Sequence, residues 1–262
     1  MNLGNITPLI LTYNEASNLD RTLQQLTWAK EIVVIDSYST DETLDIIAAY
    51  PQARVIQHKF ESFAEQCNFG LLQIDSEWVL SIDADYILSQ ELIDEISSLS
   101  DSTELSAYSV PFKYCVYGKI LRGTLYPARK VLYRKNKGVY ENDGHAHRVK
   151  IDGKVRSLKN VIYHDDRKPV IRWFNSEIKY AGLETKKLLE TPLEELSLIE
   201  KIRLKKVIAP ILVLIYCLFY KGGILDGWQG IYYASQRVLA ELLLSIKLIE
   251  NQFYNPKVND YD

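Results

Sequence analysis

The feature that most constrains this chain is the alternation of short apolar runs with helix-length segments over its first hundred residues. Runs rich in Ile, Val and Leu occupy residues 6–12, 31–36, 53–58 and 77–83. The segments with a helical pattern are 18–29, 43–50, 62–74 and 89–99. Apolar strands separated by helices of this length predict βαβ units, and therefore an α/β fold whose mostly parallel central sheet is flanked by helices. In such sheets ligands bind beyond the carboxyl ends of the strands.

Polar residues fall at the ends of these strands. Asp36 ends the second strand, and the first is followed by Thr12, Tyr13, Asn14 and Glu15. A Rossmann dinucleotide site needs glycines at the first turn so that a pyrophosphate can approach the backbone, and this turn has none. The turn offers instead groups that stack on a base or sugar and hydrogen-bond to it. The Asp36 carboxylate can accept the imide N–H of a uracil ring.

The fourth apolar run ends in two carboxylates, Asp83 and Asp85. An Asp-x-Asp triplet is a weak signal alone. An EF-hand calcium loop is excluded, because Ile87 and Leu88 stand where that loop needs an oxygen ligand and a glycine. What remains is a pair of hard oxygen donors at the ligand-binding edge of the sheet. Such a pair suits Mg²⁺ or Mn²⁺ bridged to a diphosphate.

Composition narrows the class of protein. Of the 262 residues, 47% are hydrophobic and 25% are charged, which is the balance of a folded globular chain. A formal net charge of -3 argues against a nucleic-acid binder, since phosphate binding needs a basic excess. Cys67, Cys115 and Cys217 have neither zinc-site nor disulfide spacing and fit a reducing compartment. The amino terminus lacks the basic region of a signal peptide, so we expect a cytoplasmic protein.

Four segments, in their order and spacing, resemble the inverting glycosyltransferases of family 2, which have the GT-A fold. They are LILTYNEASNLDRTL, EIVVIDSYSTDETLDI, FAEQCNFGL and WVLSIDADYIL, within about residues 5–100. The resemblance implies that the first two strand ends hold the nucleoside of a sugar nucleotide through Thr12, Tyr13, Asn14, Glu15 and Asp36. It also implies that the Asp-x-Asp pair contacts the ribose, through Asp83, and holds the metal on the diphosphate, through Asp83 and Asp85.

The third segment departs from the family pattern at one position. Family members often carry Arg or Lys directly before the residue that is Asn68 here, close to the nucleotide. This chain has Cys67 at that position, so a cation for the phosphate or the base is missing there. Asn68 is retained as a nucleotide contact, and another basic residue is the alternative source of the charge.

The acceptor half resembles members that build lipopolysaccharide core and other cell-envelope glycans. These often carry a His-Glu pair before a hairpin, and this chain has Ala146-His147 in that register. Inverting transfer needs a group that deprotonates the acceptor hydroxyl, and the candidates are Asp143 and His147. The alternative is a structural turn before a hairpin whose two-residue turn is Asp152-Gly153.

His164 also allows two interpretations. In many GT-A enzymes a histidine after the core strands completes the metal shell, and a neutral imidazole is a competent ligand for Mn²⁺-like ions. The alternative is a hydrogen-bonded structural histidine. Asp165, Asp166 and Arg167 follow it and either support the site or cap the next helix.

The pattern becomes helical from residue 168 and includes two very apolar segments. One of them, residues 207–220, follows a basic cluster of Lys201, Arg203, Lys205 and Lys206. A helix over 207–220 spans roughly 21 Å at about 1.5 Å per residue, which is less than the ~30 Å hydrocarbon core of a bilayer. Two interpretations stay open: helices that pack on the catalytic core, or a surface that dips into the membrane beside anionic headgroups.

We therefore expect a GT-A domain over residues 1–167, with a nucleotide-binding half at about 1–100 and an acceptor half at about 101–167, and a helical extension over 168–262. The expected activity is metal-dependent, inverting transfer of a sugar from a nucleotide sugar, UDP-linked, to a glycan or lipid-linked acceptor in envelope polysaccharide or lipopolysaccharide synthesis. The expected location is the inner face of the cytoplasmic membrane. Two alternatives stay open: a GT-A-fold binding protein without catalysis, and a nucleotidyltransferase.

Overall fold

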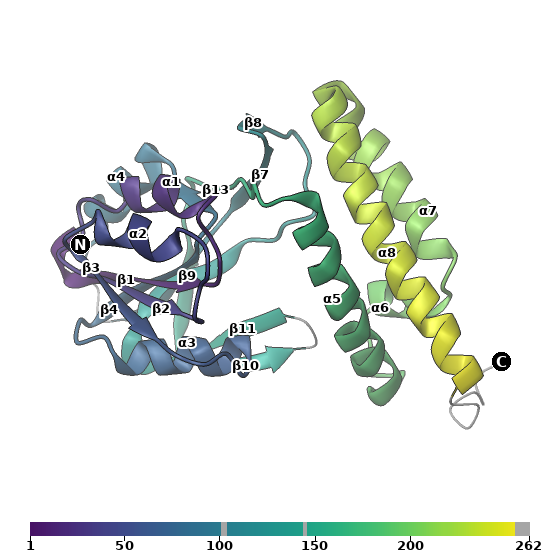
Figure 1. The fold of residues 1–262 in the computed structure, drawn as a ribbon, viewed down its shortest axis with the longest axis horizontal. Helices are drawn as coiled ribbons and strands as arrows, with labels where there is room; N and C mark the ends of the chain where they lie inside the picture. Colours follow the sequence, from purple (N-terminus) through teal and green to yellow (C-terminus); the bar gives the residue numbers. More distant parts are fainter. Residues whose placement is uncertain (101–103, 144–145, 255–262) are drawn as a thin grey trace. The chain divides into compact units, whose positions relative to one another are not determined.

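The computed structural model describes residues 1–100, 104–143 and 146–254, and of residues 142, 143, 146, 147 and 254 it describes the backbone alone. The chain divides into two compact units (Figure 1). The first contains residues 1–120 and 126–168, and the second contains residues 121–125 and those from 169 onward.

The first unit is built on a seven-stranded sheet in the order β12-β6-β9-β4-β1-β2-β3. Its strands are β1 (Ile6–Thr12), β2 (Ile32–Asp36), β3 (Ala53–Gln57), β4 (Trp78–Asp83), β6 (Leu105–Val110), β9 (Arg129–Arg134) and β12 (Lys154–Ser157). β1 pairs in parallel with β2 and β4, and β2 with β3. β9 runs antiparallel to β4 and β6. The prediction of a mostly parallel sheet is confirmed.

Helices cover both faces of this sheet (Figure 1). They are α1 (Leu19–Gln24), α2 (Thr43–Ala48), α3 (Phe63–Leu72) and α4 (Gln90–Ser98). Successive side chains of a strand point to opposite faces, so Ile10 joins the core formed with α1, α2 and α4, while Leu9 joins the core formed with α3. α1 is shorter than the predicted 18–29, because residues 25–28 form turns, and the N–H groups of Leu26 and Ala29 donate to carbonyls three residues back.

Two smaller sheets complete the first unit. One has the order β5-β13-β7-β8, and the other pairs β10 with β11. Their strands are β5 (Tyr86–Leu88), β7 (Phe112–Val116), β8 (Lys119–Ile120), β10 (Gly138–Asp143), β11 (Ala146–Ile151) and β13 (Ile162–His164). The β5–β13 pairing sets His164 opposite Tyr86 and thereby brings distant parts of the sequence together.

The predicted hairpin at Asp152-Gly153 is wrong. β12 pairs in parallel with β6, while β11 pairs with β10, so the chain passes from one sheet to another at this turn. Gly153 has a φ of 125°, a conformation that side-chain-bearing residues rarely adopt, and a Cβ there would collide with Ser106 Oγ. The Asp-Gly pair is a local turn signal, and the pairing of its flanking strands is decided by distant residues.

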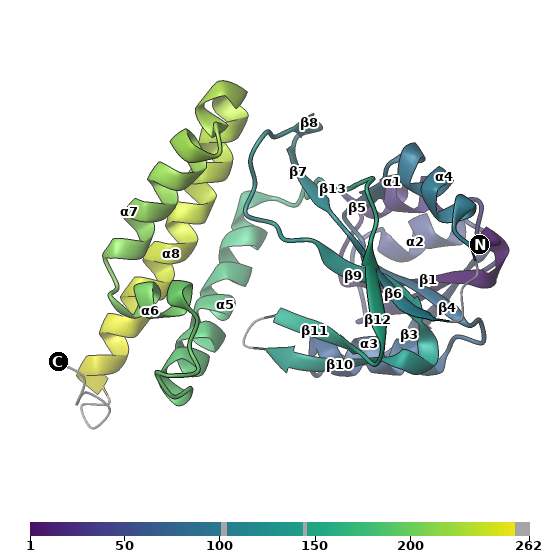
Figure 2. The same ribbon diagram turned by 180° about the vertical axis from the view of Figure 1, so that it is seen from behind.

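The second unit is helical (Figure 2). Its elements are α5 (Val170–Glu190), α6 (Leu198–Leu204), α7 (Ile208–Ile215), a π-helical turn at Tyr216–Tyr220, a 3₁₀ turn at Gly223–Asp226 and α8 (Trp228–Tyr254). Its hydrophobic core includes Leu188, Leu196, Leu244 and Leu248. The segment 121–125 joins this unit, since Leu125 N donates to Tyr233 Oη at 2.9 Å. Within the described residues, none of the helices combines the length and apolar character that crossing a bilayer requires.

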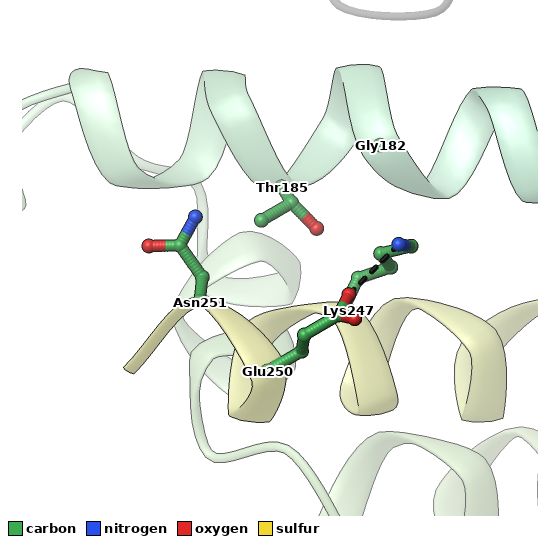
Figure 3. A pocket seen from close by; sticks show the side chains of 5 residues that line it. All are labelled: Gly182, Thr185, Lys247, Glu250 and Asn251. Atoms are coloured by element: carbon green, nitrogen blue, oxygen red, sulfur yellow. Dashed lines mark hydrogen bonds and ion pairs between the residues drawn. The ribbon is translucent and has the colours of Figure 1, made fainter. Parts of the chain in front are cut away.

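A pocket of about 230 Å³ lies between α5 and α8 (Figure 3). It is lined by Gly182, Thr185, Lys247, Glu250 and Asn251. Lys247 and Glu250 are paired with each other at 2.8 Å. Ligand sites of drug-sized molecules usually exceed about 300 Å³, so we do not assign a ligand to this pocket.

Candidate active site

The carboxyl ends of β1, β2 and β4 meet at one edge of the central sheet. Thr12 lies opposite Asp36 in the β1–β2 register, and Leu11 lies opposite Asp83 in the β1–β4 register. Parallel pairing of neighbouring strands produces this convergence, since it aligns their ends. The structure therefore gathers at one edge the strand ends that the sequence singled out.

Asp36 is fully buried at this edge. Its Oδ1 accepts from Thr12 Oγ1 at 3.0 Å and from Ser39 Oγ at 2.5 Å. Its Oδ2 accepts from Ser39 N at 2.9 Å, and Gln57 Nε2 lies at the long distance of 3.5 Å. The carboxylate thus ties together the turns that follow β1 and β2, and the 3.5 Å contact is the weakest of its four.

The turn after β1 is held by hydrogen bonds to the turn after β2. Asn14 has a φ of 55°, which Asn tolerates better than most residues. Its N–H donates to Ser39 Oγ at 2.7 Å, and its Oδ1 accepts from Thr40 N at 2.6 Å. Tyr13, by contrast, keeps 53% of its surface exposed and presents an aromatic ring at this edge.

A half-buried cluster of charges begins at Glu15. Lys168 Nζ lies 2.9 Å from Glu15 Oε1, 3.6 Å from Asp166 Oδ1 and 3.8 Å from Asp85 Oδ2. Burial raises the pKa of Glu15 to about 7, with Lys168 opposing the shift and Asp85 adding to it. No local motif predicts the role of Lys168, because Glu15 and Asp85 lie far away in the sequence. It is a residue that the sequence interpretation missed.

Asp85 and His164 form the centre of this cluster. His164 Nε2 lies 3.2 Å from Asp85 Oδ2, and Asp85 is 7% exposed. Burial disfavours the charged form of Asp85, but the neighbouring His164 and Lys168 side chains outweigh this effect and hold the pKa of Asp85 well below its usual range. Asp85 Oδ1 and His164 Nδ1 are both buried, and neither finds a hydrogen-bond partner within the described part of the chain. Such atoms in a native structure call for an explanation.

Asp83 differs from Asp85 in exposure. Its side chain is 41% exposed, and its Oδ2 lies 3.8 Å from Arg129 Nη1. Among the described residues, no three His, Cys, Asp or Glu side chains gather as a complete metal cage. Mg²⁺ is usually held by one or two carboxylates together with substrate phosphates, so an incomplete protein cage with an unpaired buried oxygen fits a metal that binds together with a diphosphate.

A second network fixes the segment after β13. Asp165, 2% exposed, accepts from Arg21 Nη1 at 2.8 Å, from Arg167 Nη2 at 2.7 Å and from Gly118 N at 3.2 Å. Arg21 belongs to α1, so this network ties residues 165–167 to the helix that follows the first turn. The expectation that these residues cap the next helix is not met, because α5 has Pro169 at its N-cap and no side-chain cap bond.

Asn68 lies on α3, and its side-chain amide hydrogen-bonds to the backbone of Tyr140 in β10. Its Nδ2 donates to Tyr140 O at 3.0 Å, and its Oδ1 accepts from Tyr140 N at 2.9 Å. Its neighbour Cys67 is 1% exposed, and burial raises the pKa of its thiol far above the ordinary range. A neutral buried thiol offers no charge to a phosphate. The predicted nucleotide contact of Asn68 stays a prediction.

The two predicted acceptor-side bases lie on the β10–β11 pair. In that register Asp143 faces Ala146 and Asn142 faces His147. The side chains of Asp143 and His147 lie outside the described residues. Their role as general base therefore stays a prediction.

Comparisons with known proteins identify the family. Residues 9–149 match the model of glycosyl transferase family 2. An uncharacterized glycosyltransferase of Rickettsia bellii is 36% identical over 104 residues, which are 39% of this chain and 35% of the relative. The lipopolysaccharide core biosynthesis glycosyltransferase LpsC of Rhizobium meliloti is 32% identical over 103 residues, which are 37% of this chain and 38% of that protein. These matches span little more than a third of either relative.

A solved structure supports the fold. The mannosyltransferase PcManGT from Pyrobaculum calidifontis, in complex with GDP-Man and Mn²⁺, superposes with a TM-score of 0.52 at 13% identity and covers 97% of this chain and 88% of its own. The mostly parallel sheet with helices on both faces is the GT-A-like arrangement that the sequence resemblance implied, and a helical region follows it. Because the family match covers more than half of the chain, this protein belongs to glycosyl transferase family 2 and is a glycosyltransferase.

Proposed function

We propose that this glycosyltransferase moves a sugar from a nucleotide sugar to its acceptor with inversion, assisted by Mg²⁺ or Mn²⁺. The observation that carries the metal assignment is the Asp85–His164 pair, in which His164 Nε2 lies 3.2 Å from Asp85 Oδ2 and Asp85 Oδ1 is buried without a hydrogen-bond partner in the described part of the chain. A neutral imidazole with its proton on Nδ1 would present the Nε2 lone pair beside this carboxylate, so one ion would be able to bind both groups. Carboxylate oxygen and imidazole nitrogen are both ligands for ions such as Mn²⁺.

Three residues of this chain would hold the metal: Asp85, His164 and the more exposed Asp83. The bound ion would neutralise charge that builds on the departing nucleoside diphosphate. Lys168 Nζ lies 3.8 Å from Asp85 Oδ2, the same oxygen that His164 contacts, and it pairs with Glu15 Oε1 at 2.9 Å. It therefore orients Asp85 so that Oδ1 is left for the ligand, and it links this carboxylate to the turn after β1.

The donor is proposed to be UDP-linked, with Thr12, Tyr13, Asn14, Glu15 and Asp36 forming the nucleoside end of the site. The half-exposed ring of Tyr13 offers a stacking face for the base. Asp36 and Asn14 shape the two turns through the hydrogen bonds described above. The long contact from Gln57 to Asp36 Oδ2, at 3.5 Å, is the one that a uracil imide N–H would replace.

The acceptor is proposed to be a glycan or a lipid-linked glycan of the cell envelope. The named relative LpsC acts in lipopolysaccharide core biosynthesis, which supports this class of acceptor. Asp143 and His147 are the proposed candidates for the base that deprotonates the acceptor hydroxyl. Asn68, through its two bonds to Tyr140, anchors β10 and thus supports the strand pair that carries both candidates.

The protein is further proposed to work on the inner face of the cytoplasmic membrane. An apolar face, defined as the exposed side chains of α7 and the turns after it, supports this location. Its members are Ile208, Ile211, Leu212, Leu214, Ile215, Tyr216, Phe219, Tyr220, Ile224 and Leu225. Exposed apolar groups on this scale mark an interaction surface, and aromatic side chains suit the headgroup level of a bilayer.

Release of nucleoside diphosphate from a panel of sugar nucleotides, with Mn²⁺ or with a chelator, tests the proposed reaction. We expect Asp85→Asn to lower release by about 10²-fold or more, because it removes the charge that holds the ion. Asp45→Asn, an exposed carboxylate on α2, is the control and should stay within about twofold. Full activity of Asp85→Asn, or activity unaffected by the chelator, would sink the metal assignment. Pyrophosphate release from a nucleoside triphosphate would instead indicate a nucleotidyltransferase.

A further inference from the structure

Arg129 is a largely enclosed cation at the edge where the donor is proposed to bind. It begins β9, and its guanidinium carbon lies 4.7 Å from the centre of the Tyr126 ring. Its Nη1 donates to Tyr86 Oη at 3.1 Å and lies 3.8 Å from Asp83 Oδ2. About a third of the side chain, 35%, remains exposed. The guanidinium is therefore fixed on an aromatic platform beside the first carboxylate of the Asp-x-Asp pair.

The contacts of Arg129 leave most of its hydrogen-bonding capacity open. A guanidinium has five N–H donors, and Tyr86 Oη is the one hydrogen-bond acceptor it meets within the described part of the chain. The 3.8 Å approach to Asp83 is an ion pair and is too long for a hydrogen bond. A planar fork with free donors beside a carboxylate suits a phosphate, which it can bind through two parallel hydrogen bonds.

The platform under Arg129 is continuous with the Asp85–His164 pair. Tyr86 and Tyr126 are joined through their hydroxyl groups. The ring of His164 lies 5.2 Å from that of Tyr86 and 4.9 Å from that of Tyr126, edge to face. Tyr86 and Tyr126 thus contact both Arg129, which carries a positive charge, and His164, which is a proposed metal ligand.

We infer that Arg129 binds the diphosphate of the donor and supplies the second positive charge that the leaving group needs, beside the proposed metal. This inference rests on the proposed function. A nucleoside diphosphate carries more negative charge than one divalent ion neutralises, and Cys67 is a buried thiol that contributes none. The bound phosphate would accept from the guanidinium N–H groups that Tyr86 leaves free, while the tyrosine platform fixes their direction.

Binding of UDP, UMP and uridine, measured by calorimetry with and without Mn²⁺, tests the inference. Arg129→Met removes the charge and keeps the length of the side chain. We expect UDP to bind about 10- to 100-fold more weakly, since a hydrogen bond to a charged group is lost, while uridine binding stays within about twofold. The matched control is Lys130→Met, the next residue of β9, whose side chain is exposed; it should leave both affinities unchanged.

Arg129→Lys covers the case in which Arg129→Met fails to fold, because it keeps the charge and loses only the fork. An intermediate loss of UDP affinity, about threefold to tenfold, is expected. Unchanged UDP binding in a folded Arg129 variant would overturn the inference, and so would an equal loss of UDP and uridine, which would indicate a merely structural counter-ion for Asp83. If the wild-type protein did not bind UDP, the proposed UDP-linked donor would fall and the inference with it.

Discussion

At the scale of single residues, the candidate site combines groups that the sequence predicts with groups that only the fold could bring there. Asp85 was identified from its position after an apolar strand, and His164 from the resemblance to GT-A enzymes; in the structure His164 ends β13. Lys168 was missed, since its contacts to Glu15 and Asp85 depend on how the segment after β13 returns to the first turn. Arg21, whose guanidinium binds Asp165, was missed for the same reason. Strand ends are local signals, whereas long-range ion pairs are not.

Glu15 gives a prediction on pH dependence. Burial raises its pKa from the ordinary 4.5 to about 7, so between these values the folded protein binds the proton more tightly than the unfolded chain does. The stability from this group is therefore complete below the lower value and is lost as pH rises through about 7. We expect the wild type to gain up to about 3 kcal/mol in unfolding free energy, relative to Glu15→Gln, as pH falls from about 8 to about 5.

Urea unfolding of both proteins across this pH range measures the difference. The Gln variant cannot titrate at this position, so it serves as the reference for all other groups. Parallel pH profiles for the two proteins would show that folding does not raise the pKa of Glu15.

At the scale of helices and strands, the sequence predicted the elements better than their partners. The apolar runs became β1, β2, β3 and β4 almost at their predicted bounds. In β1, β2 and β4 the apolar side chains are buried as local hydrophobicity predicts, whereas β3, at the edge of the sheet, is only partly buried. The strands on either side of Asp152-Gly153 were predicted to pair with each other, but β12 pairs with β6, a strand distant in the sequence that no local pattern indicates. Arg203 was placed in a basic surface cluster, yet it is enclosed by acids of α5 and α8.

Arg203 joins three helices through ion pairs. Its Nη1 lies 3.2 Å from Glu184 Oε1 and its Nη2 lies 2.6 Å from Glu241 Oε1, while Glu184 and Glu241 are 5% and 9% exposed. Arg203→Met removes this cation from beside both buried carboxylates, so we expect about 3–5 kcal/mol of destabilisation by urea unfolding. The control is Lys205→Met, at an exposed position nearby, with an expected change within about 0.5 kcal/mol. Equal stability of the two variants would contradict this role.

Two helical glycines of the second unit should respond in opposite directions to alanine. A Cβ at Gly182, inside α5, would meet nothing within 4 Å, and this residue lines the pocket of Figure 3. Gly182→Ala should therefore stabilise the protein by about 0.5–1 kcal/mol through helix propensity. At Gly230, in α8, a Cβ would collide with the carbonyl oxygen of Gly223. Gly230→Ala should destabilise it by about 1–3 kcal/mol, as overpacking does. Thermal unfolding measures both variants, and a Gly230→Ala protein more stable than the Gly182→Ala protein would contradict the prediction.

At the scale of the whole molecule, the net charge is -3, but one region places exposed apolar side chains next to lysines in the sequence. The apolar face of α7 and its following turns lies directly after Lys205 and Lys206 in the chain, and Phe219 and Tyr220 are 64% and 78% exposed. Because Arg203 is engaged with buried acids, it is not available to a lipid surface. The lysines, and not the whole predicted cluster, are the groups that would meet anionic headgroups.

Co-sedimentation with vesicles that contain anionic lipid tests this surface. Each lysine near such a surface contributes about 1 kcal/mol, so Lys205→Gln with Lys206→Gln should weaken binding about tenfold or more at low salt. Phe219→Ser with Tyr220→Ser should weaken it at low and high salt alike, because apolar burial is not screened. The control pair, Lys179→Gln with Lys186→Gln, removes the same charge from exposed positions of α5 and should leave binding unchanged. If the wild type failed to sediment at low salt, the apolar face would have to be covered by protein instead of lipid.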